Sequence, residues 1–193
     1  LETVEVPELK DGEVLVRNEY LTVDPYMRSL MNEGKSYMPP VELNATMAGG
    51  TVGEVVASKH PEFAVGDKVV GYLGWAEMGV ADGSTLRKID TSEVALQAYL
   101  GVVGMPGMTA WYGLNQIMVP KPGETVVVSA ASGAVGSVVG QLAKLKGCRV
   151  IGSAGSPEKV SWLRELGFDE AFDYHEVSAR DALSDGIDLY FDN

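Results

Sequence analysis

"VVVSAASGAVGSVVG" (residues 126–140) decides the fold of the second half of this chain. Its three leading valines predict a buried strand, and its closing residues predict the start of a helix. Between them, Ala131-Ser132-Gly133-Ala134-Val135-Gly136 has the spacing of the dinucleotide-binding fingerprint G-x-G-x-x-G, with alanine in place of the first glycine. The loop therefore predicts either a phosphate-binding turn or a merely tight connection from strand to helix.

The small side chains of this loop suit the close approach of a phosphate. A pyrophosphate needs backbone N–H groups aimed at it and a helix N-terminus behind it, and bulky side chains would block that approach. Gly133 permits the close approach, and Gly136 permits close packing of the helix on the strand. Because the loop lies between a valine strand and an amphipathic helix, the cofactor interpretation is favoured over the tight turn.

The residues around this loop alternate between strand and helix patterns. The helix after the loop is predicted to carry its apolar residues on one face: Val135, Val138, Val139, Leu142 and Leu145. A strand over 149–152 then precedes a helix that Ser156 caps and Gly167 ends. Two further short strands are predicted at 170–174 and 187–192. This βαβαβ order predicts a parallel, right-handed doubly wound sheet.

The end of the second predicted strand indicates which dinucleotide the loop would bind. NAD-binding units carry Asp or Glu about 20 residues after the loop, where it bonds the ribose 2′-OH. Here that place reads "GSAGS" (152–156), with Lys159 one turn into the helix. Because Gly155, Ser156 and Lys159 offer a helix N-terminus and a cation without a carboxylate, the sequence favours NADP(H). An ordinary solvated lysine is the alternative for Lys159.

The first 90 residues predict a β-rich domain. Short valine-rich segments there are separated by Gly, Pro and Asp turns: "GEVLVRNEYLTVD" (12–24), "GGTVGEVVAS" (49–58) and "VGDKVVGY" (65–72). From 92 to 117 the apolar spacing fits a helix, and "VPKPGET" (119–125) is a turn-rich joint. We therefore expect two domains, residues 1–119 and 120–193.

The composition argues against several classes of function. A formal net charge of −12 and the lack of a basic stripe argue against nucleic acid as a partner. Two uncharged runs, 94–120 and 125–143, are long enough to span a membrane, but glycines, prolines and serines interrupt them, so we expect no membrane segment. The single cysteine, Cys148, cannot form an internal disulfide. We therefore expect the chain in the reducing cytoplasm.

Four longer motifs give the chain a family resemblance. They are "VDPYMR" (23–28), "GMPGMTAWYGL" (104–114), "GETVVVSAASGAVGSVVGQLAKLKGCRVIG" (123–152) and "GIDLYFDN" (186–193). Together they resemble the zinc-independent medium-chain dehydrogenase/reductases, in the branch of prostaglandin, curcumin and alkenal double-bond reductases. The resemblance implies an α/β fold with a β-rich GroES-like domain and part of a Rossmann doubly wound parallel sheet.

This resemblance also implies an activity. Family members reduce the C=C bond of α,β-unsaturated ketones and aldehydes by transferring a hydride from NADPH to the β-carbon, without zinc. The implied partners are NADP(H) and a small enone or enal, and the resemblance implies a homodimer. Two alternatives are an NADPH:quinone reductase of the zeta-crystallin type and a truncated, non-catalytic nucleotide-binding protein.

The family's motifs also imply site residues at matching positions of this chain. Five positions are implied as cofactor contacts in addition to residues 131–136, Gly155, Ser156 and Lys159. They are Met105, Gly107, Thr109, Tyr174 and Asn193. For Met105, packing in the core is the alternative. Tyr26 and Tyr37 are implied pocket residues, as phenol donors to an enolate oxygen or as apolar walls. Partly buried structural tyrosines are the alternative for both.

No zinc site is predicted. Zinc-dependent relatives hold the metal with cysteines and a Gly-His-Glu run, whereas the corresponding place here reads "GGT" (49–51). Cys148 is the single cysteine, and the two histidines, His60 and His175, have no partners at ligand spacing. Structural and catalytic zinc sites both need ligands that this sequence does not supply.

Family chains continue past the "FDN" motif into a glycine pair and further strands, and they begin before Leu1. We therefore expect this sequence to be part of a longer protein. The tyrosine usually proposed as the family's proton donor would then lie beyond Asn193. A parallel sheet that stops at its fourth strand would also leave an open edge.

Overall fold

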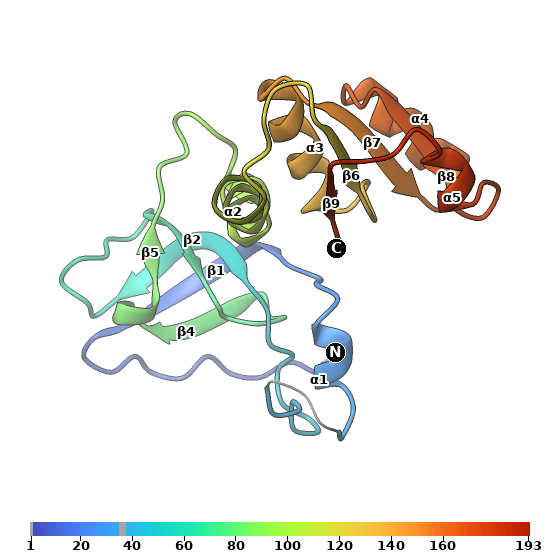
Figure 1. Cartoon of the computed structure of the whole chain (residues 1–193). Coiled ribbons are helices and arrows are strands. Elements are labelled where there is room, and N and C mark those ends of the chain that lie inside the picture. The colour runs from blue at the N-terminus through green and yellow to red at the C-terminus, as the bar shows by residue number, and fades with distance from the viewer. Residues whose placement is uncertain (1, 35–37) are drawn as a thin grey trace. The chain divides into compact units, whose positions relative to one another are not determined.

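The chain folds into two compact units, of which a computed structural model describes residues 2–34 and 38–193 (Figure 1). The first unit spans Leu1–Leu100 and the second Gly101–Asn193. Each unit has its own sheet and its own buried core. No helix within the described residues is both long enough and apolar enough to cross a membrane.

Helix α2 (Met105–Tyr112) and the π-helix η3 (Gly113–Met118) belong to the second unit. Both contact helix α3 (Gly136–Leu145). Ala110 and Leu114 are fully buried in the same core as the valines of the parallel sheet. The division into units therefore falls earlier along the chain than the domain limits expected near residue 119, and those limits stay a prediction.

The first unit contains a five-stranded antiparallel sheet with the strand order β4-β1-β2-β3-β5. Its strands are β1 (Glu13–Leu21), β2 (Thr51–Ser58), β3 (Lys68–Gly71), β4 (Met78–Asp82) and β5 (Arg87–Lys88). The alternate residues Val14 and Val16 of β1 are fully buried and share one core cluster with Val55 of β2 and Val69 of β3. The β-rich interpretation of this part of the sequence is confirmed.

Short helical turns connect these strands. Helix α1 (Met27–Leu30) places Met27 and Leu30 in the interior, where both are almost fully buried. The 3₁₀ turn η1 (Gly83–Thr85) begins at Asp82, whose side chain accepts a hydrogen bond from the N–H of Ser84 (2.8 Å). A second 3₁₀ turn, η2 (Leu96–Leu100), ends the unit.

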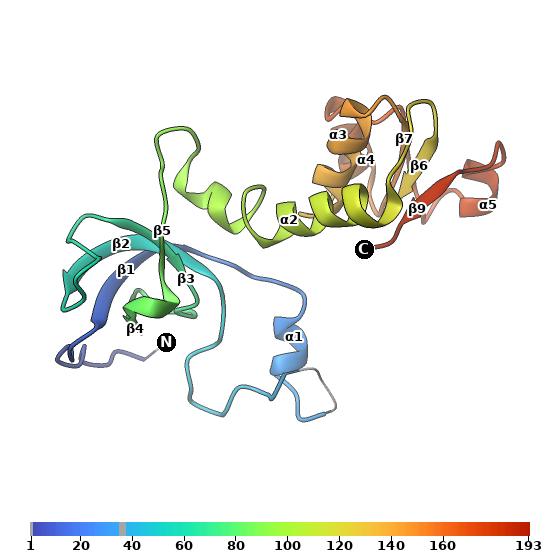
Figure 2. The same ribbon diagram turned by 60° about the vertical axis from the view of Figure 1, so that its left-hand side comes forward.

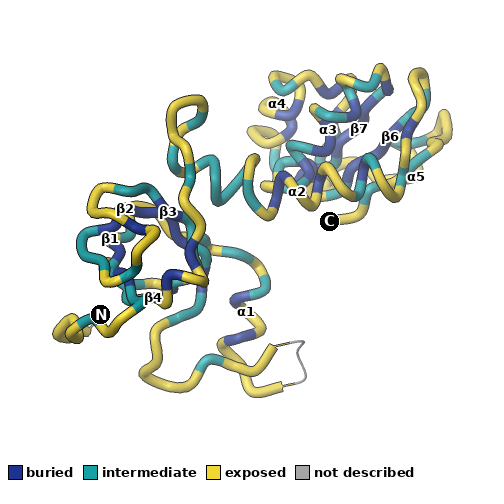
Figure 3. The backbone as a smooth tube through the Cα atoms, turned by 90° about the vertical axis from the view of Figure 1, so that its left-hand side faces the viewer, coloured by how far each residue is buried: buried dark blue, intermediate teal, exposed yellow. Residues whose placement is uncertain are grey.

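The second unit contains a four-stranded parallel sheet with the order β8-β7-β6-β9. Its strands are β6 (Thr125–Val128), β7 (Arg149–Ala154), β8 (Glu170–Asp173) and β9 (Leu189–Phe191). Val126, Val127 and Val128 are buried, and Figure 3 shows the same for most of β7. The order is that of the first four strands of a Rossmann sheet, so the predicted doubly wound parallel sheet is confirmed.

Helix α4 (Pro157–Glu165) begins and ends where the sequence predicts. The Ser156 side chain caps it, and Gly167 follows its end with a left-handed φ of +93°. Its buried residues are Val160 and Leu163. A short helix, α5 (Ala179–Ala182), precedes β9. Figure 2 shows α3 and α4 beside the parallel strands that they contact.

Helix α3 packs through most of the face predicted for it: Val139 is fully buried, and Val135, Val138 and Leu142 pack against the same core. Its buried residues are Gly136, Val139, Gly140 and Ala143. The prediction that Leu145 shares the buried face is wrong, because that side chain is 84% exposed. The helix lies close to the buried ring of Phe168, because a Cβ on Gly140 would lie 1.9 Å from Cζ of that ring. Small residues therefore share the buried side of α3 with Val139, and of the five predicted apolar residues Leu145 alone lies outside it.

Replacing Gly140 by alanine is expected to lower the stability of the chain. Alanine favours a helix over glycine by about 1 kcal/mol, but the added Cβ collides with the Phe168 ring, and such overpacking costs about 1–3 kcal/mol. Urea unfolding followed by circular dichroism measures the difference. In a Phe168→Leu background the same substitution should cost less. An equal cost in both backgrounds would contradict the close contact.

The Asp169 carboxylate joins α3 to β7. It accepts hydrogen bonds from the Lys144 ammonium (2.6 Å) and from the backbone N–H of Val150 (2.6 Å). Burial tends to raise the pKa of this carboxyl, but the Lys144 and Val150 donors outweigh burial and hold the pKa below its ordinary value. A lowered pKa in the folded state makes the stability of the chain depend on pH.

Asp169→Asn is expected to lower stability at neutral pH and to weaken the loss of stability in acid. A carboxylate with a lowered pKa contributes stability above its unfolded-state pKa, and that contribution is lost as the pH falls through its folded-state pKa. Because the carboxylate is 36% exposed, we expect about 1 kcal/mol or less. Thermal unfolding across the acid range measures this, with the exposed Asp185→Asn as control. Identical acid-side slopes in wild type and Asp169→Asn would refute the assignment.

Candidate functional site

The loop from β6 to α3 is anchored against β7 by its first small residue, Ala131. The backbone N–H of Ala131 donates to the Ser153 carbonyl (3.0 Å), and the side chain of Ala131 is fully buried. A Cβ on Gly152 would lie 2.9 Å from the Cβ of Ala131, so the methyl group already fills the space beside β7. This contact accounts for alanine at the first glycine position of the fingerprint.

The loop leaves backbone N–H groups without acceptors at the start of α3. Within the described residues, no acceptor contacts the N–H groups of Ser132, Ala134, Val135 and Gly136. A helix N-terminus carries partial positive charge, and unsatisfied donors there suit an anion such as phosphate. Gly133 and Ala134 are exposed and Ser132 and Val135 are half-buried, so an anion can reach this part of the loop from solvent.

The two glycines of the loop have different surroundings. A Cβ on Gly136 would lie 2.8 Å from both the Ala130 carbonyl oxygen and Cα of Ala131, inside the fold. A Cβ on Gly133 would meet only the Ala130 carbonyl oxygen, at 3.1 Å. Packing therefore requires glycine at 136 but hardly at 133. A ligand that approaches the exposed backbone supplies a reason for glycine at 133.

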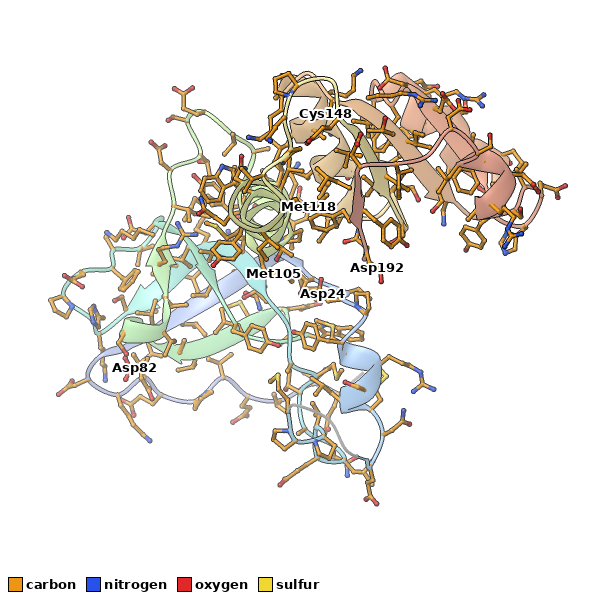
Figure 4. The ribbon with its side chains drawn as sticks, viewed as in Figure 1. Asp24, Asp82, Met105, Met118, Cys148 and Asp192 are labelled. Carbon is orange, nitrogen blue, oxygen red and sulfur yellow. The ribbon has the colours of Figure 1, made fainter. Side chains whose placement is uncertain are left out.

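The end of β9 is tied to the same loop through Ser129. The Ser129 hydroxyl donates to the Asp192 carboxylate (2.8 Å) and accepts from the backbone N–H of Asn193 (2.9 Å). The Asn193 side-chain amide donates to the Ser129 carbonyl (3.1 Å), and its nitrogen would lie 2.9 Å from a Cβ on Gly136. The structure therefore brings Asn193 beside the loop, and Figure 4 shows Asp192 at the end of β9.

The predicted 2′-phosphate residues gather at the carboxyl end of β7. The Ser156 hydroxyl accepts from the N–H of Lys159 (3.4 Å) at the start of α4. Tyr174 follows β8, and a Cβ on Gly155 would lie 2.5 Å from its hydroxyl oxygen, so the phenol covers Gly155. The His175 ring lies 4.4 Å from the Tyr174 ring between centroids. Gly155, Ser156, Lys159 and Tyr174 therefore share one surface.

Carboxylates that the sequence analysis did not weigh lie at this surface. Hydrogen bonds from its own backbone N–H and from the Ser156 hydroxyl lower the pKa of the Glu158 carboxyl, and the charge of Asp173 acts in the opposite direction. Asp173 also accepts from the backbone N–H of His175 (2.9 Å). In the described part of the chain, no carboxylate lies within ion-pair distance of the Lys159 ammonium, which stays available to an anion.

Three predicted cofactor contacts lie in α2, and of these Met105 and Thr109 are exposed and Gly107 is buried. A Cβ on Gly107 would lie 1.7 Å from the Val102 carbonyl oxygen, so only glycine fits there. The Thr109 hydroxyl donates to the Met105 carbonyl (2.8 Å). Met105, labelled in Figure 4, is 58% exposed, so it is not a core residue of this structure. Met105 and Thr109 are therefore exposed, whereas Gly107 is buried against the segment before α2.

The first unit holds the other two predicted residues. Tyr26 precedes α1, and its hydroxyl forms a hydrogen bond with the hydroxyl of Tyr72. Tyr37 lies outside the described residues. Tyr72 follows a valine-rich strand, and no pattern in the sequence predicts its contact with Tyr26.

No cluster of potential metal ligands is present in residues 2–34 and 38–193. No three His, Cys, Asp or Glu side chains there lie close enough together to hold a metal ion. Cys148 is buried, and burial, with the nearby Glu124 carboxylate, raises the pKa of its thiol. A buried, protonated thiol is a poor zinc ligand. The absence of zinc from the protein stays a prediction.

Two family models match this chain. One describes the N-terminal domain of oxidoreductases and matches residues 1–89. The other describes zinc-binding dehydrogenases and matches residues 134–193. Together they account for most of both units.

Individual relatives match the whole chain. It is 46% identical over 198 residues to NADPH-dependent curcumin reductase from Escherichia coli, covering 100% of this chain and 57% of that protein. It is 49% identical over 204 residues to prostaglandin reductase 1 from Rattus norvegicus, covering 100% of this chain and 59% of that protein. The crystal structure of CurA from Vibrio vulnificus in complex with NADPH has a TM-score of 0.91 and 46% identity, covering 100% of this chain and 58% of that chain. The chain thus spans less than two thirds of the length of these relatives.

Gly133→Ala is expected to weaken binding of NADP⁺ while leaving the fold intact. Its Cβ would lie 3.1 Å from the Ala130 carbonyl oxygen, a contact that a small shift relieves. It would, however, intrude on a phosphate at the four N–H groups, so we expect the dissociation constant to rise about tenfold or more. Calorimetric titration measures binding, and thermal unfolding measures stability. Gly136→Ala, in contrast, should lower both the affinity for NADP⁺ and the thermal stability. If Gly133→Ala binds like the wild type, the loop is only a tight turn.

Proposed function

Since the chain belongs to the medium-chain dehydrogenase/reductase family, we propose that a protein carrying it uses NADPH to reduce the C=C bond of α,β-unsaturated ketones and aldehydes. The N–H groups at the start of α3, which find no acceptor within the described residues, carry the cofactor part of this proposal. The names of the curcumin and prostaglandin reductases that match the whole chain support it.

NADP(H) would be held by three groups of residues in the second unit. The pyrophosphate would lie at the N–H groups of Ser132, Ala134, Val135 and Gly136, which Ala131 and Gly133 help to shape. The 2′-phosphate would lie at Gly155, Ser156, Lys159 and Tyr174, and the nicotinamide at Met105, Gly107, Thr109 and Asn193. Because Glu158 and Asp173 add negative charge near the 2′-phosphate, the Lys159 ammonium matters more for its binding.

NADPH, when bound, supplies the hydride for the β-carbon of the substrate. The carbonyl oxygen then gains negative charge, and hydrogen-bond donors aimed at that oxygen stabilise the transition state. Tyr26 and Tyr37 are the proposed pocket residues with phenol donors. We infer that such donors, rather than a zinc ion, polarise the carbonyl, because the one cysteine of the chain is buried and protonated.

The assembly and location of the protein follow the same family expectation. We propose a homodimer that acts in the cytoplasm on small-molecule substrates. The single free cysteine, Cys148, fits a reducing compartment. Analytical ultracentrifugation of the natural protein tests the homodimer, and a monomer would contradict it.

A preference for NADPH over NADH is expected to depend on Lys159. Lys159→Ala should raise the KM for NADPH about tenfold and leave the KM for NADH nearly unchanged, because only NADPH carries the 2′-phosphate. Lys121→Ala, which removes an exposed lysine before β6, is the matched control. An NADH preference in the wild type, or equal effects on both cofactors, would overturn the assignment.

The activity itself is tested by NADPH oxidation with a panel of enones and enals. We expect turnover of these substrates by the natural protein that carries this chain, with product analysis showing a reduced C=C bond. Oxidation of NADPH with quinones but not enones would favour the quinone reductase alternative. Calorimetric binding of NADPH without oxidation by either class would indicate a non-catalytic nucleotide-binding protein.

A further inference from the structure

His175 lies at the surface that Gly155, Ser156, Lys159 and Tyr174 form at the carboxyl end of β7. A Cβ on Gly155 would lie 2.5 Å from the Tyr174 hydroxyl oxygen and 3.2 Å from Cε1 of the His175 ring. The Tyr174 and His175 rings are 4.4 Å apart between centroids. Neither a motif nor the family resemblance gives His175 a role, so its place at this surface is a finding of the fold.

The Asp173 carboxylate orients the His175 ring. Its Oδ1 atom lies 3.1 Å from Nδ1 of the ring and also accepts the backbone N–H of His175 (2.9 Å). Asp173 is the last residue of β8, which pairs with β7, and its side chain is only 12% exposed. The carboxylate therefore holds the ring from a position that the sheet fixes.

This contact decides which ring nitrogen carries a proton. An ionised carboxylate can only accept hydrogen bonds, so Nδ1 must be the donor. In a neutral ring protonated at Nδ1, the other nitrogen, Nε2, has a lone pair and no proton to donate. The charged imidazolium, in contrast, has a second N–H at Nε2. In the part of the chain that the structure describes, Nε2 has no hydrogen-bond partner, and the side chain is 63% exposed.

Charged and titratable groups surround the ring from three segments. They are Asp173 at the end of β8, Tyr174 and Glu176 on either side of His175 in the chain, and Glu158 and Lys159 in the first turn of α4. These groups include three carboxylates and one ammonium, so a phosphate placed here meets net negative charge while His175 is neutral. Protonation of His175 balances the charge of Asp173 and adds an N–H donor.

We propose that the charged form of His175 binds the 2′-phosphate of NADP(H) through Nε2, so that the preference for NADP(H) over NAD(H) increases as the pH falls through neutrality. The inference rests on the proposed use of NADPH and adds a specificity residue to that site. The sign follows from linkage: a ligand that prefers the protonated ring takes up a proton when it binds, and its affinity is therefore higher at lower pH. Histidine gives this dependence near neutral pH because its charge changes there.

His175→Gln removes the charge but keeps a polar side chain, and it is the first test. Calorimetry on the natural protein that carries this chain measures the dissociation constant of NADP⁺. The substitution should raise this constant about tenfold at about pH 6.5 and about twofold or less at about pH 8.5. NAD⁺, which has no 2′-phosphate, should bind the wild type and the variant equally at both pH values.

His60→Gln is the matched control, because His60 is the other histidine of this chain and lies in the first unit. This variant should bind NADP⁺ as the wild type does at both pH values. A pH-dependent loss of affinity in His60→Gln as large as that in His175→Gln would contradict the assignment to His175.

Proton uptake gives a second readout that does not depend on activity. The second ionisation of a phosphate monoester has a pKa of about 6, so the 2′-phosphate is almost fully ionised at about pH 7.5. Titration of NADP⁺ at this pH in two buffers of different ionisation enthalpy counts the protons taken up on binding. We expect uptake by the wild type and by His60→Gln, and none by His175→Gln. Equal uptake by the wild type and His175→Gln would overturn the role of His175.

The outcomes keep this inference distinct from the proposed use of NADPH. A wild type that does not bind NADP⁺, or that binds NAD⁺ more tightly, overturns both. A wild type that prefers NADP⁺ while His175→Gln binds NADP⁺ equally well at both pH values overturns the role of His175 alone.

Discussion

The backbone N–H groups at the start of α3 that find no acceptor within the described chain are the constraint on which the second unit depends. The loop before α3 follows strand β6, and the buried methyl group of Ala131 holds this loop against β7. Helix α3 can begin at Gly136 because glycine has no Cβ, which would collide there with the backbone of Ala130 and Ala131. The same small residues thus form the fold and leave the donors facing outward, which is the arrangement that an anionic ligand stabilises.

Local chemistry made much of the fold predictable. The valine run 126–128 predicts β6 because three successive β-branched residues suit a strand buried on both faces. Ser156 and Gly167 bound α4 through a cap and a left-handed turn, both readable from single residues. The small residues on the buried face of α3, Gly140 and Ala143, were not predictable in this way. Glycine at 140 depends on Phe168, which follows α4 and fills the space beside it, so apolar spacing along α3 indicated Val139 and Leu142 but not Gly140.

The candidate site likewise has residues that the sequence predicts and residues that only tertiary contacts bring together. The loop and the residues at the start of α4 are contiguous in sequence, and their small side chains already indicate phosphate chemistry. Other groups come together only through tertiary contacts, such as Ser129 with Asn193 at the end of β9, and Tyr26 with Tyr72 in the first unit. Asp173 likewise joins the surface near Ser156 because β8 pairs with β7. Spacing along the chain carries no information about such pairs.

The claim that dinucleotide phosphates bind at the start of α3 is tested most directly by amide NMR. NADP⁺ is titrated into ¹⁵N-labelled protein, and the backbone resonances are followed one by one. We predict the largest shifts at the N–H groups of Ser132, Ala134, Val135 and Gly136, since these would donate to the phosphates. Binding of NADP⁺ with no shift at these four amides would contradict the account.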